Sequence, residues 1–168
     1  DTGVHAKQFF AHFDCVSNVL DTNIIYRLNS FLPEDICIKS IRKVKLDAHC
    51  RFDALSRTYE YIINKSKNPF LVDKAYFLNK CLDVDEMNKA ANCLFDFIDF
   101  TSFSKLHTQT KTNNCKIKKA VWEQRGETLV FIIQADRFLR NMVRAIVGTL
   151  IDVGSVSYTH LRAHETAV

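Results

Sequence analysis

Hydrophobic and polar residues alternate most clearly from Leu55 to Asn64. Arg57, Tyr59, Tyr61 and Ile63 fall on one face of this predicted strand, and the residues between them fall on the other. Two further strands are predicted over 116–124 and 128–135, and Arg125-Gly126-Glu127 between them indicates a hairpin turn. Weaker patterns predict a strand over 7–13, with apolar bulk on both faces, and another beginning at Ile36.

Helical spacing appears in three places. A short helix is predicted over 21–30, before a turn at Leu32-Pro33-Glu34-Asp35. Asp83 followed by Glu86 resembles a capping box and predicts a helix through about Leu94. The broadest apolar face belongs to a helix predicted over 137–153. Strands and helices mix without regular alternation, which indicates an α+β fold with a mainly antiparallel sheet flanked by helices.

Length and composition agree with a globular protein. The chain has 168 residues, about one domain's worth, and 47% of them are hydrophobic. Apolar runs stay far below the roughly 18 residues that cross a membrane, so no membrane association is expected. The six cysteines are irregularly spaced and include no C-x-x-C pair, so neither a metal site nor a disulfide framework is expected. Isolated cysteines of this kind suit a reducing cytoplasm.

Charge is unevenly distributed along the chain. Residues 39–67 contain eight basic and three acidic residues, and residues 101–148 contain nine and three. The segment 81–100 between them has five acidic residues and one lysine. Two basic segments on either side of an acidic one indicate a positive face that binds a polyanion such as nucleic acid, or a merely solvated lysine-rich surface.

One carboxylate stands out as candidate chemistry. Asp1 precedes Gly3, whose backbone can adopt a positive φ and so aim the carboxylate at a cleft. Such a carboxylate can act as a nucleophile, a base or a metal ligand, or it can simply cap a turn.

Aromatic and basic side chains are the other candidates. Tyr59 and Tyr61 share a strand face with Arg57, an arrangement that stacks bases or that simply belongs to a core. Arg137, Arg140 and Arg144 are three and four residues apart, which predicts one common helix face. They could contact phosphates, one could pair with a buried carboxylate, or they could form a solvated edge. No glycine-rich phosphate loop, H-E-x-x-H or G-x-S-x-G motif is present, so nucleotide-dependent phosphoryl transfer has no support.

Five motifs in order resemble the tRNA pseudouridine synthases of the TruA family. Residues 1–6 (DTGVHA) are similar to the family's D-x-G-V-H-A, and residues 32–36 (LPEDI) to its L-P-x-D-I. Residues 51–61 resemble its R-F-x-A-x-x-R-x-Y-x-Y strand, and residues 99–103 (DFTSF) the segment after its helix. Residues 138–154 (FLRNMVRAIVGTLIDVG) resemble its long helix. The resemblance spans about residues 1–155.

The resemblance implies an isomerase that converts uridine to pseudouridine in the tRNA anticodon stem-loop, at positions 38–40, without cofactor or metal. Asp1 matches the family's nucleophile, Tyr59 the aromatic residue that stacks on the target base, and Arg144 the arginine that pairs with the catalytic carboxylate. Arg57, Arg137 and Arg140 are then expected to contact RNA. Cytoplasmic tRNA is the implied partner, and the complete enzyme is expected to be a homodimer.

The chain also departs from the family pattern. The family's Gly-Arg-Thr before the aspartate, and a first strand and helix before that, are missing from the sequence as given. Residues 156–168 do not resemble the family's C-terminal helix and are expected to be a non-native tail. Residues 1–48 are therefore interpreted as a remnant of an N-terminal ferredoxin-like half and residues 49–155 as the C-terminal half. A fragment truncated at both ends is expected to be inactive or weakly active alone.

One alternative remains at this stage, a non-catalytic RNA-binding domain on a similar α+β sheet. It predicts that Asp1→Ala changes nothing, while losing lysines and arginines weakens RNA binding and flattens its salt dependence.

Overall fold

The computed structural model describes residues 3–15, 23–104 and 112–165, and of residues 157–165 it describes only the helical backbone. The chain divides into two compact units, one formed by Asp1–His5 with Leu55–Val168 and the other by Ala6–Ala54. The predicted halves, 1–48 and 49–155, concern the family's domain organisation and stay a prediction. The same holds for the non-native tail, although α3 continues through its first ten residues.

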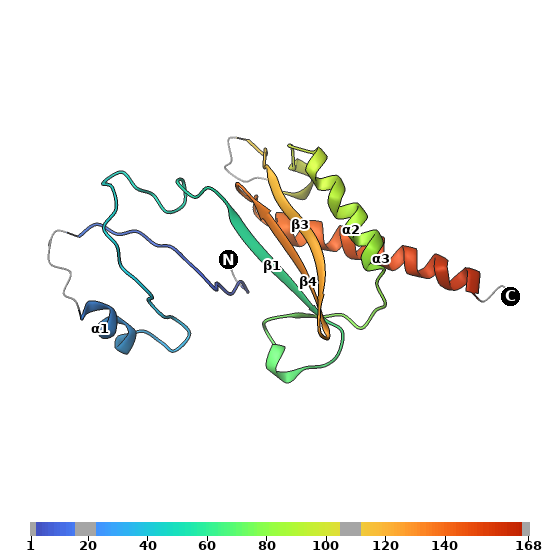
Figure 1. The fold of residues 1–168 in the computed structure, drawn as a ribbon, viewed down its shortest axis with the longest axis horizontal. Coiled ribbons are helices and arrows are strands. Elements are labelled where there is room, and N and C mark those ends of the chain that lie inside the picture. Colours follow the sequence, from blue (N-terminus) through green and yellow to red (C-terminus); the bar gives the residue numbers. More distant parts are fainter. Residues whose placement is uncertain (1–2, 16–22, 105–111, 166–168) are drawn as a thin grey trace. The chain divides into compact units, whose positions relative to one another are not determined.

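The larger unit is built on one four-stranded sheet (Figure 1). Its strands are β1 (Arg57–Asn64), β2 (Tyr76–Phe77), β3 (Ile117–Arg125) and β4 (Thr128–Ala135), in the order β2-β1-β4-β3. β4 pairs antiparallel with both β1 and β3, and only the two-residue β2 runs parallel to β1. Helices complete the unit, which confirms the predicted α+β class and its mainly antiparallel sheet.

The predicted hairpin joins β3 to β4. Arg125 pairs with Thr128, so the turn contains only Gly126 and Glu127. Gly126 has a φ of 59°, in the left-handed region that tight hairpin turns require and that glycine adopts without steric cost.

One face of the sheet forms the core with two helices. Alternate residues of β4 point into it, and Leu129, Phe131 and Ile133 are completely buried. The helices are α2 (Val84–Asn92) and α3 (Met142–Glu165), which pack against each other. Their buried side chains in the same cluster are Met87, Ala91, Met142, Ile146, Val147 and Leu150.

Helix α2 begins where its capping residues predict. The Asp83 carboxylate accepts a hydrogen bond of 3.0 Å from the Glu86 amide, which satisfies a donor that the first helical turn leaves unpaired. The helix is followed by a 3-10 turn, Cys93–Asp96, and two other 3-10 turns cover Pro69–Leu71 and Thr101–Phe103.

Helix α3 starts later than the sequence pattern predicts. The expected start was Arg137, but the helix begins at Met142, after Asn141 adopts a positive φ of 68°. The Asp136 carboxylate accepts hydrogen bonds from the Arg137 and Lys116 amides, which holds this segment as an irregular connection. Arg137 and Arg140 therefore precede the helix, and the prediction that they share a helix face with Arg144 is wrong.

The smaller unit contains one helix, α1 (Ile24–Phe31), close to its predicted range. The turn after it is confirmed by the hydrogen bond from the Ile36 amide to the Pro33 carbonyl. The strands predicted over 7–13 and from Ile36 are wrong, because the described residues there have no strand structure. A strand exists only with a paired neighbour, and Phe9 and Phe10 are instead 81% and 68% exposed.

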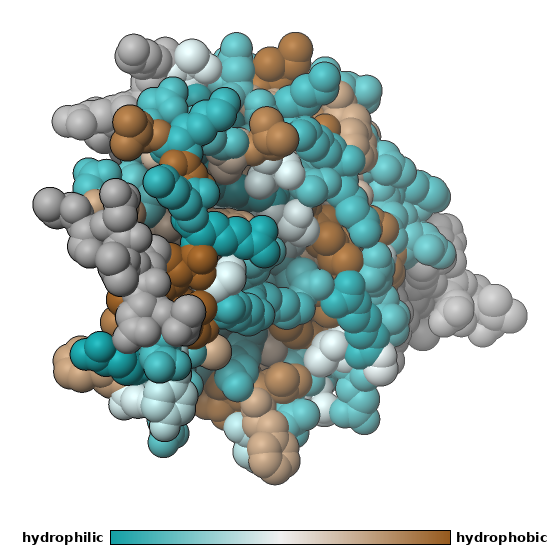
Figure 2. Space-filling model, turned by 60° about the vertical axis from the view of Figure 1, so that its left-hand side comes forward, coloured by the Kyte–Doolittle hydropathy of each residue, from teal (hydrophilic) through white to brown (hydrophobic). Residues whose placement is uncertain are grey.

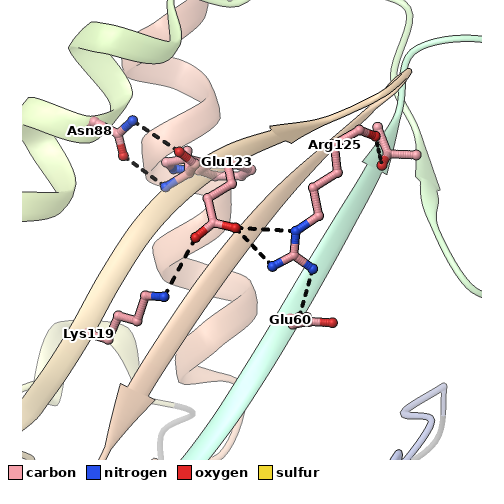
Figure 3. Close-up of polar contacts among 7 residues, drawn as sticks. Glu60, Asn88, Lys119, Glu123 and Arg125 are labelled. Atoms are coloured by element: carbon pink, nitrogen blue, oxygen red, sulfur yellow. Dashed lines mark hydrogen bonds and ion pairs between the residues drawn. The ribbon is translucent and has the colours of Figure 1, made fainter.

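The opposite sheet face and the β3 edge carry polar contacts (Figure 3). Arg125 bridges Glu60 on β1 and Glu123 on β3, each at 2.9 Å. At the β3 edge the Asn88 side chain accepts from the Trp122 amide at 2.8 Å and donates to the Trp122 carbonyl at 3.2 Å. Asn88 thus supplies both hydrogen bonds that a neighbouring strand would make at this position.

Hydrophobic side chains are also present at the surface, where Figure 2 shows them among hydrophilic ones. In the larger unit, Phe70, Phe97 and Ile98 are examples. Among the described residues, no helix is long and apolar enough to cross a membrane.

Candidate active site

The segment that follows Asp1 belongs to the same compact unit as the sheet. Gly3 has a φ of 75°, so this position is strained for any residue with a side chain. Nε2 of His5 hydrogen-bonds to the Asp73 carbonyl oxygen at 2.9 Å, which ties the segment to the chain just before β2. Asp1 itself lies outside the described residues.

Gly3 lies next to the guanidinium of Arg144. A methyl group added at Gly3 would be 3.6 Å from Nη2 of Arg144, which is ordinary van der Waals contact. Arg144 is exposed and is the third residue of α3. Gly3, two residues after Asp1, therefore lies beside Arg144, the arginine that the motif resemblance identifies.

Tyr59 is fixed by the connection before α3. Its ring meets the Phe138 ring edge-on, with 5.2 Å between the ring centroids and 81° between the planes. This arrangement is favourable for aromatic pairs and restricts how the Tyr59 ring can turn. The ring is half-buried and packs against the core.

Arg144 also borders a surface depression of about 370 Å³ between the β1–β2 side of the sheet and α3. Tyr61, Tyr76 and Lys80 line it on the sheet side, and Gly148 and Asp152 line it on the helix. Burial raises the pKa of the Tyr61 phenol above its usual value, Tyr76 raises it further, and the Arg144 guanidinium acts in the opposite direction. Tyr61 is thus a neutral hydroxyl at neutral pH in a basic surrounding.

The other predicted arginines lie at one end of the sheet. Arg57 begins β1 opposite Ala135, the last residue of β4, and Arg137 follows two residues later. Arg140 is exposed in the same connection. The three arginines therefore lie on the chain where β1 begins and just after β4 ends, although not on one helix face.

The structure thus brings some predicted residues together and adds others. It places Gly3 beside Arg144, and Tyr59 against Phe138. Tyr76 and Lys80 had not been predicted, because both come from a short segment without any alternating pattern. Only the parallel pairing of β2 with the end of β1 brings them to Tyr61.

A metal centre has no ligand set in the part of the chain that the structure describes. No group of three or more His, Cys, Asp or Glu side chains gathers there in a way that could hold an ion.

Comparisons with known proteins point in the same direction as the motifs. A family model described as tRNA pseudouridine synthase matches residues 98–165. The proteins named tRNA pseudouridine synthase A from Parabacteroides distasonis and Bacteroides fragilis are 54% and 55% identical to this chain, over 155 and 156 residues. Each comparison covers 92% of this chain and 62% of the relative. A more distant relative of the same name, from Treponema denticola, is 37% identical over 159 residues.

The chain is similar to the tRNA pseudouridine synthases over most of its length. It spans about three fifths of the length of the curated relatives that it matches. The segment matched by the family model contains β3, β4, α3 and the connection before α3. Arg144 and Phe138 therefore lie in the part of the chain that the family model matches.

Proposed function

We propose that this chain is part of an isomerase that converts uridine to pseudouridine in the anticodon stem-loop of tRNA, at positions 38–40. Similarity to proteins named tRNA pseudouridine synthase supports the reaction and its tRNA substrate. The observation that supports the assignment to residues is the position of Gly3 beside the Arg144 guanidinium, where an added methyl group would lie 3.6 Å from Nη2. Asp1 is only two residues from Gly3 in the sequence, and we propose that its carboxylate reaches this guanidinium.

In the proposed mechanism, Asp1 is the nucleophile and Arg144 keeps it ionised. A cation next to a carboxylate favours the charged form, which is the form that can attack. The carboxylate attacks either the base or the sugar, and both routes give the same net change. The net change breaks the bond between C1′ and N1, turns the uracil and joins C5 to C1′. The proton leaves C5 and N1 gains one, so no cofactor is consumed.

Tyr59 is proposed to stack on the target base. The reacting uridine must leave its base stack, and an aromatic platform offsets part of that cost. Phe138 supports the platform, because the edge-on contact holds the Tyr59 ring in one orientation. Arg57, Arg137 and Arg140 are proposed to contact phosphates of the tRNA backbone.

The test is tritium release from tRNA labelled at C5 of uridine, because that hydrogen is lost when C5 bonds to C1′. In the complete protein, Asp1→Ala is expected to abolish release and to leave tRNA binding within about threefold of wild type. Release by Asp1→Ala at the wild-type rate would show that Asp1 is not the nucleophile. No release by the wild-type complete protein, with tRNA binding intact, would favour the alternative, a non-catalytic RNA-binding domain.

The resemblance to this family also suggests two wider proposals. The complete protein is proposed to be a homodimer, which light scattering on a sizing column tests. It is also proposed to act in the cytoplasm, where fractionation of cells should find it with tRNA. A monomer at micromolar concentration would contradict the first proposal.

A further inference from the structure

Two glycines of α3 lie in different surroundings. Gly154 is buried, and a methyl group added there would be 2.7 Å from both Cγ and Sδ of Met87. Close packing of α2 on α3 therefore explains Gly154. Gly148 is exposed, and apart from its chain neighbours and the backbone of its own helix no described atom lies within 4 Å of a methyl group added there. Glycine is less favourable than alanine inside a helix, so packing among the described residues gives no reason for Gly148.

Gly148 lines the depression beside Arg144. Arg144, Gly148 and Asp152 follow one another at intervals of four, so they lie along one face of α3. The missing side chain at Gly148 leaves a gap between a cation and a carboxylate. Tyr61, Tyr76 and Lys80 form the opposite wall.

The chemistry of this depression matches a nucleotide. Lys80 and Arg144 suit a phosphate, and the half-exposed Tyr76 ring offers a surface for a base. Asp152 at the far end accepts hydrogen bonds, which suits a ribose hydroxyl or a base amino group. A simple polyanion supplies only the first of these three groups.

We propose that the depression around Gly148 is a subsite for a second nucleotide of the tRNA, distinct from the uridine that stacks on Tyr59. The subsite rests on the proposed function, because tRNA is its ligand. Its phosphate lies at Lys80 and Arg144, its base lies against Tyr76, and Gly148 provides the room. The subsite adds affinity for one position in the RNA next to the reacting uridine.

Gly148→Leu tests the subsite directly, because leucine favours helix and fills the depression. In the complete protein, its affinity for tRNA is expected to fall at least tenfold, with a melting temperature no lower than that of wild type. Lys80→Gln is expected to weaken binding several-fold and to reduce the salt slope of binding by about one. Lys89→Gln, an exposed lysine on α2 that pairs with Glu86, is the matched control and should bind tRNA like wild type.

Heparin, which has charge but no bases, distinguishes a nucleotide subsite from a general anionic surface. Gly148→Leu is expected to leave heparin binding unchanged. Equal losses for heparin and tRNA, or wild-type tRNA affinity in Gly148→Leu, would overturn the proposal. Neither result would contradict the proposed reaction. That reaction is tested separately, by tritium release from the wild-type protein and by the loss of this release in Asp1→Ala.

Discussion

Gly3 lies beside the guanidinium of Arg144, so two motifs that are about 140 residues apart in sequence meet in one place. Gly3 has a left-handed backbone there, and Arg144 belongs to the first turn of α3. The hydrogen bond from His5 to the Asp73 carbonyl holds the segment there. The proposed reaction depends on this meeting point, because it brings the chain carrying Asp1 to a cation.

Gly3→Ala should reduce turnover strongly. A left-handed backbone costs an alanine about 1–2 kcal/mol, and the strain is relieved by moving the segment away from Arg144. We expect tritium release by the complete protein to fall at least tenfold. The matched control is Gly126→Ala in the β3–β4 turn, which has a φ of 59° and open space around it. It carries similar strain and should keep its turnover, so equal losses in both variants would contradict a special role of Gly3.

Substitution of the two helix glycines should have opposite effects on stability. In Gly154→Ala the methyl group meets Met87 at 2.7 Å, and overpacking of this kind costs about 1–3 kcal/mol. In Gly148→Ala the added methyl group has open space around it among the described residues. This substitution should raise the free energy of unfolding by up to about 1 kcal/mol. Urea unfolding measures both. A destabilised Gly148→Ala would show that packing does require glycine there.

Asn88→Ala should destabilise the β3 edge. It removes the partners of the Trp122 amide and carbonyl, and leaving such groups unsatisfied costs about 1–3 kcal/mol. Amide hydrogen exchange at Trp122 should become faster by a corresponding factor. Lys89→Ala, the next residue on α2, loses only the exposed pair with Glu86 and should leave stability nearly unchanged. Unchanged exchange at Trp122 in Asn88→Ala would contradict this account.

Tyr61 should ionise later than an ordinary tyrosine. Its pKa is raised in the folded protein, so the folded state holds this proton more tightly than the unfolded chain. By linkage, stability is then lost as pH rises from about 10, the unfolded value, through the folded pKa. Tyr61→Phe should remove tyrosinate absorbance that appears above pH 10 and should flatten this loss. If the absorbance missing from Tyr61→Phe is one that the wild-type protein shows at or below pH 10, the raised pKa of Tyr61 would be contradicted.

Arg144→Gln provides a second check on the same phenol. The guanidinium lowers the pKa of Tyr61, so its removal should move the ionisation of Tyr61 to still higher pH. An unchanged titration of Tyr61 in this variant would show that the two groups do not interact.

Local patterns predict the larger unit well. The alternation from Leu55 to Asn64, the Arg125–Glu127 turn and the Asp83 cap each depend on neighbouring residues, and each is confirmed. The predicted start of α3 was wrong because Phe138 and Leu139 continue the apolar spacing of the helix although they precede it. The positive φ of Asn141 and the hydrogen bond from the Arg137 amide to the Asp136 carboxylate keep this segment out of the helix. The strand over 7–13 was wrong because a strand also requires a partner, which a local pattern does not contain.

The candidate site was only partly accessible from the sequence. Motif resemblance supplied Asp1, Tyr59 and Arg144, and their roles stay proposals. Tyr76 and Lys80 follow only from the parallel pairing of β2 with β1, which joins segments separated by a loop. The contrast between Gly148 and Gly154 is invisible in the sequence, because it depends on which helix face meets α2.

A double-mutant cycle on Asp1 and Arg144 tests the central claim most directly. Tritium release in single turnover is measured for Asp1→Asn, Arg144→Gln and the double variant of the complete protein, at saturating tRNA. If the two groups act as a pair, the double variant should be about as slow as the slower single variant, because groups that act as a unit are not additive. Losses that multiply in the double variant would show that Asp1 and Arg144 act independently and would contradict the proposed pair.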